Sequence, residues 1–165
     1  MIEPQMAKGW RERHDMIRRY GPAPDPARHY TRRPGVYALL PNGGKLLVTR
    51  QNRPDSAREF QLPGGGVDPG ETPLAALHRE VFEETGWRIQ PLRRLGAFRR
   101  FTWMPDYALW AEKLCVIYLA RPLRQVAPAT EPDHAPHWLS LQAATRLLAS
   151  EGDRATLIRH LRRLR

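Results

Sequence analysis

The sequence lacks the features of a secreted or membrane-spanning protein. It contains a single cysteine, Cys115, so no disulfide can form within the chain. No apolar run approaches the length that crosses a membrane, and the first residues show no signal-peptide core. Cys115 lies in the apolar run Leu114–Ala120, which predicts a buried thiol with no reactive role. We therefore expect a cytoplasmic protein that folds without a disulfide framework.

Acidic residues are outnumbered by basic ones. The chain has 17 acidic and 27 basic side chains, for a net charge of +10. Residues 1–34 and 145–165 both carry an excess of positive charge. An arginine-rich surface attracts polyanions such as phosphates and nucleic acid, but it also serves solubility alone. The charge by itself therefore names no substrate.

Length and proline content predict how the chain is divided. With 165 residues, 41% of them hydrophobic, the chain suits one domain with its own core. Pro22, Pro24, Pro26 and Pro34 break up the first segment. We expect a basic N-terminal arm over residues 1–34, with a short helix at its start, followed by a domain over residues 35–165.

Apolar runs and turn residues predict the strands of this domain. Pro41–Gly44 separates the apolar runs Gly35–Leu40 and Lys45–Thr49, which is typical of a hairpin. Two long strands are expected over Leu92–Phe101 and Tyr107–Leu119, with a loop over residues 102–106 between them.

The last part of the chain is expected to finish the domain with two helices. The prolines and polar breakers of Arg121–Pro136 predict a loop, and His137–Leu139 a short strand. Helices are expected over Leu141–Ala149 and Ala155–Leu164. The second is predicted to be amphipathic through its apolar residues, which are Leu157, Ile158, Leu161 and Leu164.

Three glutamates in the middle of the chain indicate a metal site. Glu80, Glu83 and Glu84 are spaced i, i+3 and i+4 in a segment of helical periodicity, so their carboxylates share one helix face. Like charges this close repel one another unless a positive charge lies among them. A hard divalent cation is the usual solution, because it prefers oxygen ligands.

The flanks of this segment predict a docked, capped helix. Thr72 and Pro73 are typical of an N-cap and first helical position, and Gly86 of a C-terminal stop. The predicted buried stripe consists of Leu74, Leu77 and Val81. Before the helix, the glycines at positions 64–66 and Pro69-Gly70 predict a loop whose backbone can approach a ligand closely.

Taken together, these residues resemble the box of the Nudix (MutT-like) hydrolase family, G-x5-E-x7-R-E-U-x-E-E-x-G-U, where U is bulky and aliphatic. The matching residues are Gly65, Glu71, Arg79, Glu80, Val81, Glu83, Glu84 and Gly86. Trp87 departs from the pattern at the final U, which is a packing position. The resemblance implies an α/β/α sandwich on a mixed sheet, an α/β (α+β) fold that the expected order of strands and helices also favours.

The resemblance further implies an activity and a set of roles. Members of the family hydrolyse a nucleoside diphosphate linked to another moiety, X, with Mg²⁺ or Mn²⁺ as the cofactor. By resemblance, the metal is bound by Glu80, Glu83 and Glu84 together with the carbonyl of Gly65. Arg79 then holds a box glutamate in place by an ion pair, and Glu71 supports the loop. One glutamate could instead act as the base, and the pattern leaves open which one.

Candidates outside the box are fewer and more general. Glu131 is the first choice for an additional base or metal ligand from a later loop, with Glu112 and Asp106 behind it. Possible substrate contacts are Arg50 and Arg53 for phosphate, and Trp103 and Tyr107, with Trp110, for stacking on a nucleobase.

Three functional interpretations remain open at this point. The first is a pyrophosphohydrolase of small nucleotides, and the second is an enzyme acting on the 5′ end of RNA, which the net charge motivates. The third is a catalytically silent nucleotide-sensing or RNA-binding module, which the complete set of box glutamates disfavours. No membrane partner is expected; the oligomeric state is open, and a homodimer is compatible with the sequence.

Overall fold

The computed structural model of the chain describes residues 17–52 and 59–164. Within these residues, seven strands form one sheet whose central order is β3-β2-β1-β6-β5. Strand β4 pairs with β1, and β7 pairs with β2. The strands are β1 (Thr31–Asn42), β2 (Lys45–Gln51), β3 (Glu59–Gln61), β4 (Gly64–Gly66), β5 (Trp87–Met104), β6 (Leu109–Gln125) and β7 (His134–Ser140). Because β1 and β6 are parallel and the other pairs are antiparallel, the sheet is mixed, as expected.

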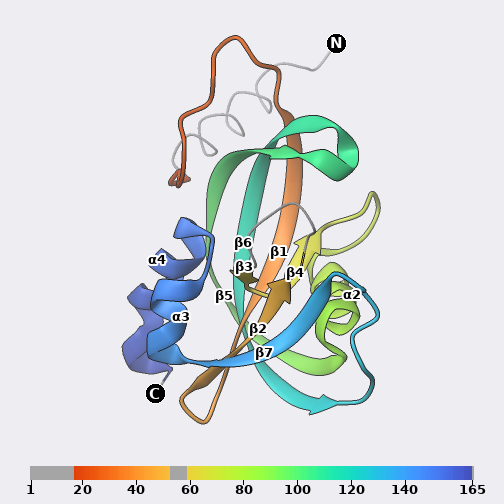
Figure 1. Ribbon diagram of the computed structural model, residues 1–165, viewed down its shortest axis with the longest axis vertical. Coiled ribbons are helices and arrows are strands. Elements are labelled where there is room, and N and C mark those ends of the chain that lie inside the picture. The colour runs from red at the N-terminus through yellow and green to blue at the C-terminus, as the bar shows by residue number, and fades with distance from the viewer. Residues whose placement is uncertain (1–16, 53–58, 165) are drawn as a thin grey trace, which may run out of the picture.

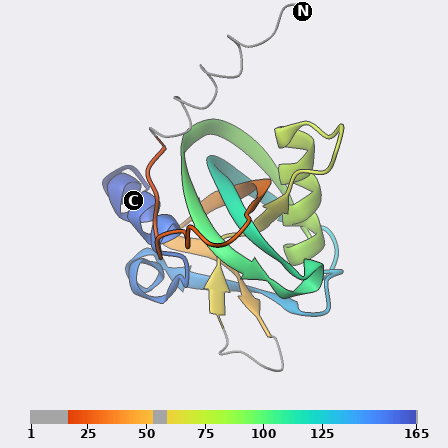
Figure 2. The same cartoon turned by 90° about the horizontal axis from the view of Figure 1, so that it is seen from above.

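Helices cover both faces of the sheet. Helix α2 (Pro73–Thr85) lies on one side, and α3 (Leu141–Leu147) and α4 (Glu151–His160) lie on the other (Figures 1 and 2). The predicted α/β/α arrangement is therefore confirmed. Within the described residues, no helix combines the length and apolar composition needed to span a membrane.

Strand β1 supplies side chains to both hydrophobic cores. Its segment 35–40 is buried throughout, and alternate residues point to opposite faces of the sheet. Tyr37 and Leu39 join the core beneath α3 and α4, whereas Val36, Ala38 and Leu40 join the core beneath α2. A continuous apolar run with no polar alternation is what a strand covered on both faces requires.

The expected hairpin and the buried thiol are both confirmed. Strands β1 and β2 pair from Asn42 to Lys45 around Gly43 and Gly44, whose φ angles of 54° and 74° suit a type I′ turn. Cys115 is buried, and burial raises the pKa of its thiol to about 11. Strand β1 begins at Thr31, so the last residues of the expected N-terminal arm belong to this strand. The helix expected at the start of the arm lies outside the described residues.

The strands after the box helix are longer than the sequence predicts. β5 and β6 pair from Met104–Leu109 at the tip to Trp87–Gln125 at the base, so only η1 (Pro105–Tyr107) and Ala108 separate them. The predicted loop over Arg121–Pro136 was wrong at both ends, because β6 continues to Gln125 and β7 begins at His134. Pro122 lies beyond the last pairing of β6 with β1, and Pro136 lies in β7, which pairs with β2 alone. Each proline therefore has one side without a neighbouring strand, where no ladder hydrogen bond is needed.

The helices also differ from prediction in detail. α4 begins at Glu151 rather than Ala155, because the Ser150 side chain accepts a hydrogen bond from the Asp153 N–H and caps it. After His160 the chain tightens into the 3₁₀ turn η2 (Leu161–Arg163). Two residues assigned to buried stripes are exposed instead: Leu74 at 45% and Ile158 at 57%. Ala76 and Thr85 extend the buried face of α2 in place of Leu74.

Gly86 gives a direct test of how the end of α2 is built. It adopts a left-handed φ of 72°, and a side-chain carbon there would collide with the carbonyl of Ala127. Gly70 has a similar φ of 81° but open space around it. We expect Gly70→Ala to lower the free energy of unfolding by about 1–2 kcal/mol from backbone strain alone. Gly86→Ala should lower it by about 3 kcal/mol or more, because strain and overpacking add. Urea denaturation of both variants measures the difference; equal losses would contradict the collision.

Candidate functional site

Helix α2 carries the box residues and is capped at both ends. Thr72 accepts a hydrogen bond from the Ala75 N–H at 3.2 Å, Pro73 occupies the first turn, and Gly86 ends the helix in the left-handed conformation. The caps predicted from the sequence are therefore all present. Leu77 and Val81 are fully buried against the core beneath α2, so the opposite, acidic face points toward the glycine loop of β4.

Arg79 is the centre of an ion-pair network that joins the helix to this loop. Its Nε and Nη2 donate to the two carboxylate oxygens of Glu71 at 2.9 and 2.8 Å. Its Nη1 donates to Glu80 at 2.7 Å and to Glu83 at 3.3 Å, and Nη2 also reaches the carbonyl of Gly66 at 3.1 Å. The hydrogen bond from Arg79 lowers the pKa of Glu71 to about 2. One guanidinium thus fixes three carboxylates and the loop backbone.

The backbone of Gly65 packs directly against the side chain of Glu80. A side-chain carbon on Gly65 would collide with the Glu80 carboxylate. The Glu80 side chain is largely buried, and burial raises its pKa to about 7 against the lowering effect of Arg79. The glycine loop and the helix are therefore packed face to face at this carboxylate.

The C-terminal end of α2 also holds the later loop that carries Glu131. The carbonyl of Glu83 accepts hydrogen bonds from the N–H groups of Thr130 and Glu131, at 2.8 and 3.1 Å. The N–H of Val126 donates to the carbonyl of Gly86 at 3.0 Å. Carbonyls at a helix end have no partner within the helix, so the loop over residues 126–133 satisfies them and is positioned by them.

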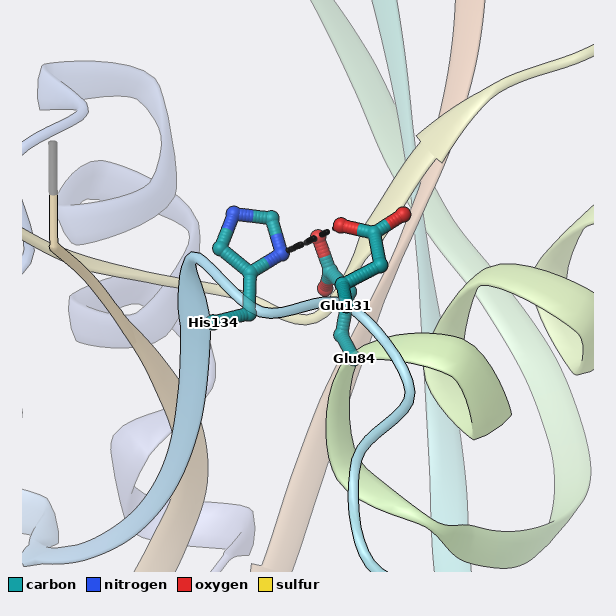
Figure 3. A group of neighbouring side chains, drawn as sticks. All are labelled: Glu84, Glu131 and His134. Carbon is teal, nitrogen blue, oxygen red and sulfur yellow. Dashed lines mark ion pairs between the residues drawn. The ribbon is translucent and has the colours of Figure 1, made fainter.

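This loop brings Glu131 and His134 to Glu84 (Figure 3). The Nδ1 of His134 lies 3.0 Å from a carboxylate oxygen of Glu84 and 2.7 Å from one of Glu131. The other oxygen of Glu84 accepts a hydrogen bond from the Gly64 N–H at 2.9 Å. Burial raises the pKa of Glu84, against the effects of His134 and the Gly64 N–H. Burial lowers the pKa of His134, but its contacts with Glu84 and Glu131 outweigh this and raise it.

The side chains fall into two overlapping groups that could hold a cation. Ligand atoms of Glu80, Glu83 and Glu131 lie within 4.8 Å of one another, and so do those of Glu84, Glu131 and His134. Carboxylate oxygens are the donors that Mg²⁺ and Mn²⁺ prefer. The Nδ1 of His134 already contacts carboxylate oxygens of Glu84 and Glu131, so the carboxylates supply the ligand atoms. The donor set therefore fits a divalent ion, with Glu131 common to both groups.

The other predicted contacts lie outside the two cation groups. Trp103 and Asp106 border a cavity of about 370 Å³ between β1, β5, β6 and α4. Tyr107 is exposed at the hairpin tip beneath Arg33, and Trp110 packs on Tyr30 and Trp103. Arg50 and Glu112 line neither the cavity nor the cation groups, and Glu112 pairs with Arg32 and Arg99. Arg53 lies outside the described residues.

His134 is the site residue that sequence reasoning missed. It stands opposite Gln51 in the pairing of β7 with β2, and this register carries it to the end of α2. The spacing Glu131-x-x-His134 was the available signal, because two potential ligands lie three residues apart. This signal was overlooked because an uninterrupted loop was predicted over that segment.

Comparison with known proteins identifies the family of this chain. The NUDIX domain model matches residues 30–161. RNA pyrophosphohydrolase of Pectobacterium atrosepticum is 39% identical over 66 residues, which are 37% of this chain and 37% of that protein. The chain thus spans little more than a third of the curated relatives that it matches.

Solved structures extend the similarity over most of the chain. The MutT NUDIX hydrolase of Burkholderia pseudomallei has a TM-score of 0.62 and 26% identity, covering 78% of this chain and 97% of that one. The MutT protein of Methanosarcina mazei has a TM-score of 0.63 and 25% identity, covering 82% and 96%. With the family model matching most of its length and the box residues gathered at one site, this chain belongs to the NUDIX family of hydrolases.

Proposed function

We propose that the protein is a metal-dependent pyrophosphohydrolase that cleaves the diphosphate of a nucleoside diphosphate linked to another moiety, X. The observation that carries the proposal is the convergence of Glu80, Glu83 and Glu131 at the end of the glycine loop. Clustered carboxylates destabilise a fold unless cations join them. A diphosphate brings negative charge that repels a nucleophile, so its hydrolysis needs the same cations.

Each box residue has a distinct part in this proposal. Glu80, Glu83, Glu84 and the Gly65 carbonyl hold Mg²⁺ or Mn²⁺, which supplies charge neutralisation and a lowered pKa for bound water. Arg79 orients Glu80 and Glu83, and Glu71 fixes Arg79 in turn. Glu131 is the base or an additional ligand. His134 keeps Glu131 directed toward Glu84, since its Nδ1 lies against both carboxylates.

RNA with a 5′ polyphosphate is the second candidate substrate. The similarity to proteins named RNA pyrophosphohydrolase favours it, although only 37% of this chain is covered. Trp103 and Tyr107 are also exposed, and bases stack on such rings. However, Arg28 and Arg33 lie over Trp110 and Tyr107, so these cations and rings already contact each other. We therefore prefer a small nucleotide, for which the box and the glycine loop are sufficient.

The assignment of the box is tested by removing charge without changing size. Glu83→Gln and Glu84→Gln should each lower kcat by roughly 10² or more, the scale of losing a positioned base or a metal-held nucleophile. Turnover of a panel of nucleoside diphosphate derivatives is measured at saturating Mg²⁺ and again with Mn²⁺. Glu151→Gln, at the start of α4, serves as the matched control and should leave kcat unchanged. Full activity in both box variants would falsify the assignment.

Arg79 is expected to act on the carboxylates rather than on the substrate. Arg79→Lys keeps the charge but loses the planar fork that grips Glu71 with two hydrogen bonds. We expect metal affinity to weaken roughly tenfold or more, and kcat to fall, with KM nearly constant. The rise in melting temperature with added Mg²⁺ reports metal affinity independently of turnover. A change confined to KM would instead indicate that Arg79 contacts phosphate directly.

The two substrate classes are separated by salt dependence and relative turnover. RNA binding neutralises several phosphates, so its affinity should fall steeply with salt if RNA is the substrate. Binding of a short 5′-triphosphorylated RNA is measured from low to physiological salt, beside kcat/KM for RNA and for free nucleotides. We expect a shallow slope and higher kcat/KM for a small nucleotide. A steep slope together with a clear preference for RNA would reverse the choice.

A further inference from the structure

A segment that precedes β1 is attached to the domain along β5. Residues 18–30, which we call the strap, appear in red and orange beside β5 (Figures 1 and 2). The Tyr20 N–H donates to the carbonyl of Arg99, and the Arg99 N–H donates to the carbonyl of Arg18, both at 3.0 Å. The Tyr20 ring meets the Phe98 ring edge to face, with centroids 5.6 Å apart. The strap therefore forms a short parallel bridge on the last strand of the sheet.

The second half of the strap packs on the β5–β6 hairpin near its tip. The ring of Tyr30 contacts the rings of Phe101 and Trp110, at centroid distances of 4.9 and 6.2 Å. The guanidinium of Arg28 lies 4.0 Å from the centre of the Trp110 ring. Asp25 joins these two residues, because its N–H donates to the Tyr30 hydroxyl at 3.0 Å and its carboxylate lies 3.1 Å from Arg28. The strap is thus a closed turn whose ring and cation both contact the hairpin.

This part of the hairpin extends beyond the neighbouring strand. The pairing of β1 with β6 begins at Ala111, so residues 103–110 form a two-stranded ribbon with no third strand among the described residues. A two-stranded ribbon is marginally stable by itself in water. Trp103 stands opposite Trp110 in the ribbon, with ring centroids 5.5 Å apart. A contact that fixes Trp110 therefore also fixes Trp103.

The ribbon forms one wall of the cavity of about 370 Å³ that lies between β1, β5, β6 and α4. Residues 103–106 line this wall, and Phe98, against which Tyr20 packs, also lines the cavity. The cavity reaches the glycine loop, because Tyr37 lines it and occupies the space beside Gly64. A nucleotide whose diphosphate lies at the box can therefore extend through the cavity to the ribbon.

We propose that the strap holds the ribbon in the position at which Trp103 borders the cavity, and that Tyr30 and Arg28 thereby act as positioning residues for substrate binding. The inference rests on the proposed function, because it concerns substrate affinity at the same site. Residues 18–29 precede the segment that matches the NUDIX domain model, so this part of the strap is an addition to the matched domain. A ribbon that is in place for only part of the time lowers the apparent affinity by that fraction.

The first test measures the ribbon itself. Tyr30→Ala removes the ring that contacts Phe101 and Trp110, whereas Tyr30→Phe keeps the ring and loses only the hydroxyl. We expect amide hydrogen exchange over residues 103–110 to become about tenfold faster in Tyr30→Ala and to stay close to the parent in Tyr30→Phe. Leu161→Ala, in the turn after α4, is the matched control for lost core packing and should leave exchange in the ribbon unchanged.

The second test measures substrate affinity. Binding of ADP, GDP, CDP and UDP is measured by calorimetry with Mn²⁺, beside KM and kcat for the panel of nucleoside diphosphate derivatives. Tyr30→Ala should raise KM, and the Kd of the nucleotide that the parent binds most tightly, by about fivefold or more. Its kcat and its Kd for Mn²⁺ alone should stay within about twofold of the parent, because the strap does not contact the box. Tyr30→Phe should bind nucleotide like the parent.

A general loss of structure gives a different result from a displaced ribbon. It would weaken Mn²⁺ binding together with nucleotide binding, because the box depends on the complete fold, and this outcome would contradict a positioning role. Arg28→Gln extends the test should Tyr30→Ala not fold, since Arg28 is exposed and its replacement removes only the cation over Trp110. We expect Arg28→Gln to weaken nucleotide binding about threefold.

The outcomes separate this proposal from the proposed function. Nucleotide affinity equal to that of the parent in Arg28→Gln and in folded Tyr30→Ala would overturn the role of the strap, even where hydrolysis is normal. Unchanged hydrogen exchange over the ribbon in folded Tyr30→Ala, or failure of all four nucleoside diphosphates to bind the parent, would overturn it as well. Nucleotide binding that depends on the strap, without hydrolysis of any anhydride, would contradict the proposed function instead.

Discussion

Mutual repulsion of carboxylates at the end of α2 is the constraint on which the rest of the site depends. Glu80, Glu83, Glu84 and Glu131 lie close together, and burial, with the charges of Glu84 and Glu131, raises the pKa of Glu80 to about 7 against the opposing effect of Arg79. The fold opposes this repulsion with fixed groups rather than mobile surface charges: the forked guanidinium of Arg79, the N–H of Gly64 and the ring of His134. These groups come from the helix, the glycine loop and β7, so the carboxylates can approach one another only when all three are assembled. The geometry of the site therefore depends on the complete tertiary structure.

The main chain of α2 organises the site as much as its side chains do. The Glu83 side chain faces Arg79, whereas the Glu83 carbonyl accepts the N–H groups that fix Glu131. Gly86 ends the helix in a conformation that lets the loop return directly over it, with the Ala127 carbonyl in the place of a side chain. Glu83 thus contacts Arg79 through its side chain and positions Glu131 through its backbone carbonyl. Movement of the helix end would therefore displace the Glu83 and Glu131 carboxylates together.

What the sequence predicts well is local, and what it misses depends on pairing between distant segments. The caps at Thr72 and Gly86 and the hairpin at Gly43-Gly44 are encoded within a few residues, and the structure has all of them. The strand ends around Pro122 and Pro136 could not be read locally, because a proline is tolerated only where the neighbouring strand is absent. His134 joins Glu84 through the register of β7 on β2, which no local spacing specifies. Leu74 fits the helical period, yet it is exposed because the buried face of α2 is centred on Ala76, Leu77 and Val81.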